Sequence, residues 1–264
     1  MTSPADSFRA LHHGPDILVL PNAWDAGSAR LMQTLGAKAV ATTSAGVAWS
    51  HGYPDGDALP LDALLSTVRA MRRVLTIPLS VDVEGGYSAD PDHAAATVAA
   101  VVAAGAVGIN IEDGAAPPDL LCAKLARIRA SVGPGLFINV RTDVYLRGLA
   151  DDRVAAVLAR AEAYRAAGAD GLFVPGLSAP EDIRAVVAAC DLPLNVMAVP
   201  GLPPADELQA LGVRRLSAGS AIIQTLWAEA WGLSGEFLRL GRADLVAGTA
   251  MPFGEINGLF TGKA

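Results

Sequence analysis

The feature that most constrains the fold is a joint that recurs four times along the chain. At each joint, an Ala- or Leu-rich amphipathic run ends in glycine and a short β-branched segment follows at once; the glycines are Gly36, Gly105, Gly168 and Gly212. Glycine just past a helix end readily takes the left-handed conformation that other residues resist, so the chain can turn directly into a strand. The joints therefore predict helices that lead straight into the strands of a sheet.

Segments of strand length alternate with helical patterns along the whole chain. The predicted strands are 17–20, 39–42, 78–83, 107–111, 136–140, 171–174, 193–196 and 213–216. The predicted helices are 26–35, 61–74, 92–104, 119–131, 151–167, 180–189, 205–211 and 221–246. Eight alternating units in about 250 residues predict an α/β fold, the parallel (β/α)8 TIM barrel, with a doubly wound open sheet as the alternative. Because no Ser- or Pro-rich linker interrupts the series, we expect a single domain over residues 1–264.

The last predicted helix is more apolar than one face of a barrel requires. Residues 219–247 include large apolar side chains at Ile222, Ile223, Leu226, Trp227, Trp231, Phe237 and Leu238. An apolar surface of this kind is typical of a subunit interface. We therefore expect this helix to pack on a partner subunit in a homodimer or homotetramer.

Composition and charge exclude several classes of partner. The chain has 20 Lys and Arg against 27 Asp and Glu, so its net charge of −7 argues against nucleic acid. The uncharged stretch 94–111 is mostly alanine broken by Gly105 and Gly108, which indicates a helix followed by a strand rather than a membrane span. Two cysteines without metal-ligand spacing, and an N-terminus without the apolar core of a signal peptide, predict a cytoplasmic protein.

Polar residues gather where the predicted strands end. The active site of a TIM barrel lies at this C-terminal rim. The rim positions are Asn22, Trp24, Thr43, Ser44, Asp82, Glu84, Glu112, Asp113, Arg141, Asp143, Pro175, Asn195 and Ser217. Five carboxylates and one arginine form a cluster that a bare scaffold would not need, so we interpret the cluster as the functional site.

The carboxylates of this cluster have the spacing of a metal site. Asp82 and Glu84 lie two residues apart at the end of one strand and share a face, and Glu112 approaches from the next strand. Oxygen ligands without His or Cys suit a hard cation such as Mg²⁺, with Mn²⁺ as a substitute. Spacing alone leaves a second interpretation open, in which these carboxylates pair with Arg141 and cap helices.

A single arginine and a run of small residues complete the predicted rim. Arg141 follows the apolar strand 136–140, and a guanidinium in a barrel mouth needs an anion: a substrate carboxylate, a developing enolate, or simply Glu112 or Asp143. The small residues of 41–47 would let backbone N–H groups approach a bound anion, although a plain loop would use the same residue types. Trp24 could form a wall of the pocket or only pack.

Several common catalytic devices are absent from the sequence. The chain has no nucleotide-binding glycine fingerprint and no histidines at zinc-like spacing. Its lysines, Lys38, Lys124 and Lys263, do not fall at predicted strand ends, which disfavours Schiff-base chemistry. The cluster of carboxylates and Arg141 therefore remains as the candidate site.

At these residues the sequence resembles the isocitrate lyase/phosphoenolpyruvate mutase superfamily over most of its length. The resemblance rests on Pro21-Asn22-Ala23-Trp24-Asp25-Ala26-Gly27-Ser28-Ala29, Thr42-Thr43-Ser44-Ala45-Gly46, Gly52-Tyr53-Pro54-Asp55, Val81-Asp82-Val83-Glu84-Gly85-Gly86-Tyr87, Ile111-Glu112-Asp113 and Val140-Arg141-Thr142-Asp143. It implies a barrel whose eighth helix is swapped between subunits. It also implies Mg²⁺ bound directly by Asp82, with Asp55, Glu84 and Glu112 holding its waters.

The resemblance also implies a substrate. Members of the superfamily act on 2-oxo acids or on compounds that become them, held by backbone amides near residues 43–46 and by the arginine. The residues predicted to bind such a small 2-oxo acid or dicarboxylate are Trp24, Thr43, Ser44, Ala45, Gly46, Arg141 and Asn195. Asp82 and Arg141 are the predicted catalytic residues, since a metal and a guanidinium together would neutralise an enolate as it forms.

Departures from the family pattern narrow the expected reaction. The Lys-x-Cys-Gly-His gating motif of the lyases is replaced by Gly-Ala-Ala-Pro-Pro at 114–118, and no Lys-Thr-Asn run of the mutases is present. Where the lyases carry Glu after the sixth strand, this chain has Pro175-Gly176, and Met197 and Val199 follow Asn195. A site without a strong built-in acid suits a reaction whose enolate takes its proton from water. Decarboxylation of an oxaloacetate-like diacid and a retro-aldol cleavage that yields a pyruvate-like enolate both fit this description, and we expect the decarboxylation. The alternatives are an isocitrate-like or methylisocitrate-like lyase, and a 2-oxo acid binder, for example of 2-oxoglutarate, without turnover.

Overall fold

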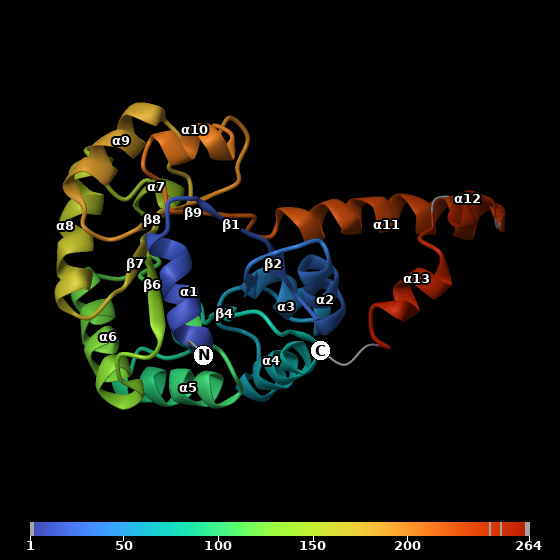
Figure 1. Cartoon of the computed structure of the whole chain (residues 1–264), viewed down its shortest axis with the longest axis horizontal. Helices are drawn as coiled ribbons and strands as arrows, with labels where there is room; N and C mark the ends of the chain where they lie inside the picture. The colour runs from blue at the N-terminus through green and yellow to red at the C-terminus, as the bar shows by residue number, and fades with distance from the viewer. Residues whose placement is uncertain (1–2, 243, 249, 262–264) are drawn as a thin grey trace.

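Parallel strands curve into a barrel that helices surround in the computed structural model, which describes residues 3–242, 244–248 and 250–261 (Figure 1). The strands are β1 (Leu18–Leu20), β2 (Asn22–Ala23), β3 (Val40–Thr42), β4 (Leu79–Asp82), β5 (Gly108–Glu112), β6 (Phe137–Arg141), β7 (Gly171–Phe173), β8 (Leu194–Met197) and β9 (Arg215–Ser217). Their order in the sheet is β1-β9-β8-β7-β6-β5-β4-β3-β2, and every neighbouring pair is parallel.

The strands β1 and β2 are two parts of one barrel strand. Only Pro21 separates them, and proline has no N–H to continue a ladder. The first part pairs with β9 and the second with β3, so this broken strand closes the sheet on itself. The described strands thus occupy the eight positions of a (β/α)8 TIM barrel, which confirms the predicted fold class.

Helices follow the strands much as the glycine joints predict. The helices α2 (Ala26–Thr34), α4 (Leu61–Val74), α5 (Pro91–Ala103), α6 (Pro118–Val132), α8 (Arg153–Ala166), α9 (Pro180–Ala189) and α10 (Ala205–Ala210) lie within two residues of the predicted bounds. The four joint glycines all have positive φ, from 91° to 112°. This backbone conformation is the one that the sequence argument assigned to them.

The structure also contains helices that the sequence analysis did not predict. They are α1 (Pro4–His13), α3 (Ser44–Ser50), α7 (Val144–Arg147) and α13 (Phe253–Gly258), whereas α12 (Asp244–Ala247) overlaps the end of the predicted helix 221–246. Residues 44–50 form a helix because the Thr43 hydroxyl accepts a hydrogen bond from Gly46 N and caps its start. The predicted helix 221–246 was too long: α11 (Ala221–Leu240) ends where Gly241 adopts φ 62° in the left-handed region.

Helix α1 packs against the end of the barrel opposite the rim. Phe8 and Phe137 meet edge to face, and the His12 ring stacks on Phe137 at 4.0 Å between centroids. The His12 Nδ1 atom donates to the Phe8 carbonyl oxygen at 2.8 Å, and burial lowers the pKa of His12 to about 3. His12 is therefore a neutral part of the core at this end.

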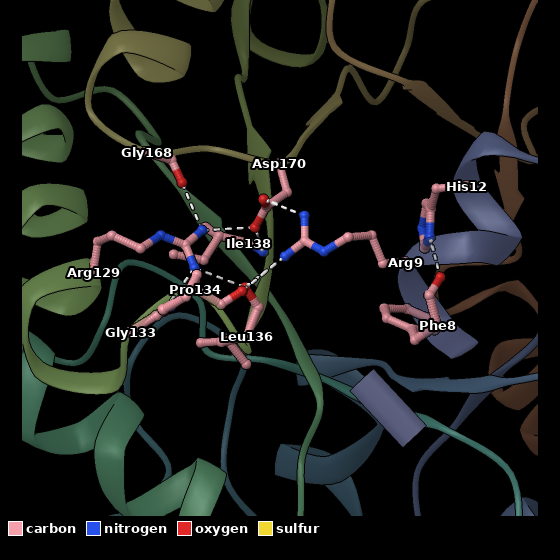
Figure 2. A network of polar contacts seen from close by, with 10 residues as sticks. All are labelled: Phe8, Arg9, His12, Arg129, Gly133, Pro134, Leu136, Ile138, Gly168 and Asp170. Atoms are coloured by element: carbon pink, nitrogen blue, oxygen red, sulfur yellow. Dashed lines mark hydrogen bonds and ion pairs between the residues drawn. The ribbon is translucent and has the colours of Figure 1, made fainter. Parts of the chain in front are cut away.

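A partly buried ion network joins α1 to the barrel (Figure 2). Asp170 accepts from Arg9 Nη1 at 2.5 Å, from Arg129 Nη2 at 2.6 Å and from Ile138 N at 2.9 Å. Backbone carbonyl oxygens accept further hydrogen bonds from the two guanidinium groups (Figure 2). The Gly168 carbonyl, for example, accepts from Arg129 Nη2 at 2.6 Å. One carboxylate therefore joins α1, α6 and the start of β7.

Replacing Asp170 with alanine is expected to lower the free energy of unfolding by about 2–3 kcal/mol, because two guanidinium groups and a backbone N–H lose a shared, partly buried acceptor. Urea denaturation followed by circular dichroism measures this loss. The matched control is Asp92→Ala, which removes an exposed ion pair with Arg127 and should cost less than about 1 kcal/mol. Equal losses in the two variants would contradict the structural role of the network.

Helix α11 leaves the barrel instead of covering it (Figure 1). Its large apolar side chains are exposed, with Trp231 85% and Leu238 83% accessible. On the barrel itself, Val19 of β1 is 55% accessible, although the residues on either side of it are buried. An eighth helix packed on β1 and β9 would cover Val19. The observed structure thus has an uncovered strand and an unpartnered apolar helix.

Candidate active site

A cavity of about 180 Å³ opens where the strands end. Parallel strands bring their carboxyl ends to one rim of the barrel, so residues far apart in the sequence meet there. The cavity is lined by Asn22, Thr43, Ser44, Ala45, Asp55, Asp82, Asn110, Arg141, Leu146, Phe173, Met197, Ser217, Gly219 and Ser220. The predicted residues Thr43, Ser44, Ala45, Asp55, Asp82 and Arg141 therefore share one cavity.

The four carboxylates predicted to form the metal site are divided between two hollows. Asp82 and Asp55 line this cavity, whereas Glu84 and Glu112 line a second hollow of about 450 Å³. Glu84 has φ 50°, a left-handed conformation that is uncommon outside glycine, and its backbone N–H donates to Asp82 Oδ1 at 3.0 Å. The turn after β4 thus holds the carboxylates of Asp82 and Glu84 close together.

Crowding and burial favour the protonated forms of these carboxyl groups. Burial raises the pKa of Asp82, and burial with neighbouring carboxylates raises the pKa of Glu84 to about 7. Burial raises the pKa of Glu112 to about 8 despite the nearby Arg141 guanidinium. A divalent cation bound beside these three carboxyl groups would favour their ionised forms.

The donor set suits a hard cation that keeps part of its water. Within the described ranges 3–242, 244–248 and 250–261, no three His, Cys, Asp or Glu side chains are grouped closely enough to enclose a metal ion. Mg²⁺ binds through one or two carboxylates and retains several waters, so it does not require such an enclosure. Oxygen donors at Asp82, Asp55, Glu84 and Glu112 fit this ion by their chemistry.

Arg141 is fixed at the rim by two carboxylates. Its Nη1 atom lies 2.6 Å from Glu112 Oε2, and its Nε and Nη2 atoms donate to the two oxygens of Asp143 at 2.6 and 3.1 Å. Asp143 is fully buried and also accepts from Arg147 Nε at 2.8 Å. A guanidinium has five N–H groups, so Arg141 keeps donors for the cavity while these bonds hold its plane. The structure thus combines the salt bridges and the cavity-facing position that the sequence left as alternatives.

Three residues predicted to bind substrate do not line the cavity. Trp24 packs against the hydrophobic core, and a Cβ on Gly46 would lie 3.0 Å from the Trp24 Cβ, so close packing accounts for that glycine. Asn195 is buried below the rim, where its Nδ2 atom donates to Ser217 Oγ at 3.1 Å and to the Arg215 carbonyl at 3.2 Å. The structure thus places these three residues outside the cavity lining.

Sequence reasoning missed two parts of the cavity. An apolar wall is formed by Leu146, Phe173 and Met197, which belong to three different segments. Asn110 also lines the cavity, from within β5 rather than from the strand end. The signal for Asn110 was present in the sequence, since it is an amide among apolar residues of a buried strand.

Comparison with known proteins places the chain in a family. The family model described as phosphoenolpyruvate phosphomutase matches residues 8–236. The chain belongs to this family, within the phosphoenolpyruvate mutase/isocitrate lyase superfamily. The predicted family membership is confirmed, and the TIM barrel is the fold that its members share.

Individual relatives in this superfamily differ in their reported activities. The chain is 42% identical over 219 residues to an uncharacterised protein of Mycobacterium tuberculosis. The aligned residues cover 81% of this chain and 82% of that protein. It is 33% identical to an oxaloacetate decarboxylase of Bradyrhizobium (74% of each chain) and 32% identical to a 2-methylisocitrate lyase of Salmonella typhimurium (80% and 77%). A solved structure from Burkholderia cenocepacia, provisionally assigned as a phosphonomutase, superposes with a TM-score of 0.84 at 39% identity over 89% of this chain and all of that one.

The structure bears on the membrane prediction as well. In the part of the chain that is described, no helix has both the length and the apolar character needed to cross a bilayer. The long helix α11 is interrupted by polar and charged residues such as Glu229 and Glu236.

Proposed function

We propose that this chain is a Mg²⁺-dependent carbon–carbon lyase that decarboxylates a small 2-oxo dicarboxylic acid of the oxaloacetate type. The observation that supports this function is that one small cavity is lined by both charged and apolar side chains. Asp82, Asp55 and Arg141 line it, and so do the large apolar side chains of Leu146, Phe173 and Met197. The similarity to an oxaloacetate decarboxylase agrees with this proposal.

In the proposed site, Asp82 would bind the metal directly, and Asp55, Glu84 and Glu112 would accept hydrogen bonds from its waters. Mg²⁺, or Mn²⁺ in its place, would supply positive charge that stabilises an anionic oxygen of the substrate. The carboxylates at the edge of the site fix the waters and thus the position of the ion. The backbone N–H groups of Ser44 and Ala45 lie in the first turn of α3, where they have no intrahelical acceptor and can donate to the substrate carboxylate.

In this reaction Arg141 stabilises the negative charge that develops on the enolate oxygen. Loss of the distal carboxylate breaks the bond between C3 and C4, and the electron pair of that bond remains as an enolate of the 2-oxo acid. The guanidinium already lies at the cavity with its plane held by Asp143 and Glu112, so little reorganisation is needed when the charge forms. The proton that completes C3 comes from water.

The apolar wall favours the loss of carbon dioxide. A carboxylate placed against Leu146, Phe173 and Met197 would meet apolar side chains. Among the described residues that line the cavity, Arg141 is the only basic one, and in this proposal it faces the other end of the substrate. An ionised carboxylate in apolar surroundings is destabilised, whereas neutral carbon dioxide is not. The wall therefore raises the free energy of the substrate relative to that of the products.

The direct test is the formation of pyruvate from oxaloacetate. We expect the purified chain with Mg²⁺ to produce pyruvate above the rate of Mg²⁺ alone, as measured by a coupled spectrophotometric assay. A rate equal to that of the metal alone would contradict the proposal. If the chain is instead a binding protein, Mg²⁺ with 2-oxoglutarate would raise its melting temperature and the 2-oxo acid would be recovered unchanged.

The second candidate function is cleavage of an isocitrate-like or methylisocitrate-like hydroxy acid. The similarity to a 2-methylisocitrate lyase favours it. The same cavity and metal site would serve, but the expected products differ. Glyoxylate from isocitrate, or pyruvate from 2-methylisocitrate, without turnover of oxaloacetate, would select this function over the first.

We also propose that α11 packs on the barrel of a partner subunit, in a homodimer or homotetramer. In this arrangement the exposed Trp231 and Leu238 of one subunit's α11 would cover the exposed Val19 on the barrel of the other subunit. Replacing Trp231 with glutamate should shift the protein to a smaller oligomer, because a charge would enter an apolar interface. Light scattering after gel filtration measures the mass. The control Glu229→Gln, on the same helix, should leave the mass unchanged, and an unchanged mass in both variants would exclude this interface.

A further inference from the structure

The floor of the cavity contains an amide that the sequence analysis did not single out. Asn110 lies in the middle of β5, is 4% accessible and lines the cavity. In the sheet it is in register with Asp82 on one side and with Asn139 on the other. The amide is thus a lateral neighbour of the proposed metal ligand.

Hydrogen bonds fix which way this amide points. Asn110 Oδ1 accepts from Asn139 Nδ2 at 2.9 Å and from Arg215 Nη2 at 3.3 Å. Both partners are donors, so only the oxygen of the amide can face them. No described residue accepts a hydrogen bond from Asn110 Nδ2, and the side chain borders the cavity. The NH₂ group is therefore left for a ligand in the cavity.

Arg215 lies below this floor as a buried cation. It is fully inaccessible, and its Nε and Nη1 atoms have no hydrogen-bond partner among the described residues. Burial lowers the pKa of its guanidinium to about 9, so it remains protonated near neutral pH. A buried guanidinium with two unpartnered nitrogens is costly, and an apolar residue of similar size would serve the core better. The cost indicates a role outside simple packing.

We propose that Arg215 is a positioning residue that holds the Asn110 amide so that its N–H groups donate to an oxygen of the bound 2-oxo acid. Two donors on Oδ1 prevent the amide from turning its oxygen toward the ligand, which would repel a carboxylate or an enolate. The site thereby selects an anionic oxygen beside the metal. The identity of the ligand rests on the proposed function, but the hydrogen-bond geometry does not.

The test measures the binding of oxalate, a planar dianion that resembles the enolate of pyruvate. Isothermal titration calorimetry of the full chain with saturating Mg²⁺ gives the affinity without any turnover. Asn110→Ala should weaken oxalate binding about tenfold through the loss of a hydrogen bond to a charged group. Asn110→Asp should weaken it more, since it places a carboxylate against the ligand. The matched control is Ser80→Ala, which removes a different buried polar atom of the barrel interior and should leave the affinity unchanged.

A double-mutant cycle separates positioning from a general effect of charge. If Arg215 acts through Asn110, Arg215→Gln should weaken oxalate binding in the wild-type background and have much less effect in the Asn110→Ala background. Independent, multiplicative effects would overturn the proposal. Melting temperatures show which variants fold, and Arg215→Lys replaces Arg215→Gln if the latter does not.

The outcomes also separate this inference from the proposed function. Unchanged oxalate affinity in folded Asn110→Ala overturns the inference, whether or not the enzyme turns over oxaloacetate. Oxalate binding that depends on Asn110, in a chain that forms no pyruvate, supports the inference and contradicts decarboxylation. Wild-type chain that binds no oxalate with Mg²⁺ contradicts both.

Discussion

Replacing Asp82 with asparagine is expected to reduce the formation of pyruvate from oxaloacetate to the rate of free Mg²⁺, a loss of at least about 10³-fold. Asparagine has nearly the same shape as aspartate and can still accept the hydrogen bond from Glu84 N, which is 3.0 Å long in the wild-type structure. The substitution therefore removes the charge and leaves the turn after β4 in place. Among the proposed ligands, Asp82 is the one expected to bind the metal directly, so the other carboxylates cannot replace it.

Two measurements make this prediction specific. Titration calorimetry should show that Mg²⁺ binding to Asp82→Asn is too weak to detect at concentrations that saturate the wild type. Thermal denaturation without metal should show no loss of stability, since burial raises the pKa of Asp82 and its ionised form is costly in the metal-free protein. The control Asp62→Asn changes an exposed carboxylate in the first turn of α4 and should retain full activity. Asp82→Asn with more than about a tenth of wild-type activity would exclude a metal-dependent mechanism at this residue.

The barrel could be predicted from the sequence because its strongest signals are local. A glycine with positive φ lets a helix turn at once into a strand, and Gly36, Gly105, Gly168 and Gly212 all have this conformation. Apolar strands between such joints leave few alternatives to a parallel α/β sheet. The rim carboxylates and Arg141 could be predicted for a related reason, since charge at the end of an apolar strand must face either solvent or a ligand.

Helices without an amphipathic period could not be predicted in this way. The sequence of α3 is Ser-Ala-Gly-Val-Ala-Trp-Ser, whose small residues fit a loop as well as a helix. The helix forms because Thr43 caps it and because Val47 and Ala48 pack into the core. Both reasons are tertiary or depend on side-chain geometry. The position of α1 against Phe137 has the same origin, since nothing local indicates which end of the barrel it covers.

The apolar lining of the cavity could not be predicted from local sequence patterns either. Leu146, Phe173 and Met197 look like ordinary core residues in the sequence, and only the curvature of the barrel brings them together as a wall. Conversely, Asn195 was predicted to lie at the rim, yet it is the second residue of β8 and its side chain is buried and hydrogen-bonded below the rim. Strand ends are defined by one or two residues, and a shift of one residue reverses the face of a side chain.

Substituting Arg141 is expected to separate two roles of its guanidinium. Arg141→Lys keeps the positive charge but loses the planar fork, and we expect kcat for oxaloacetate to fall about 10²-fold. Arg141→Gln loses the charge as well, and we expect a fall of about 10⁴-fold, since the enolate then forms without a cation from the protein. Steady-state kinetics with saturating Mg²⁺ gives both values, and KM should change much less than kcat if the arginine acts mainly on the developing charge.

The same substitution should also affect folding, because Arg141 neutralises a carboxylate that has no access to solvent. Asp143 is fully buried between Arg141 and Arg147, so Arg141→Gln leaves it with one of its two cationic partners and should lower the free energy of unfolding by about 3 kcal/mol. Arg147→Gln is the matched control: it removes the other cation from Asp143 but does not alter the cavity lining. We expect it to be less stable than the wild type and close to it in kcat. Equal losses of kcat in folded Arg141→Gln and Arg147→Gln would show that Arg141 supports Asp143 and does not act on the substrate, whereas a loss confined to Arg141 assigns the charge stabilisation to this guanidinium.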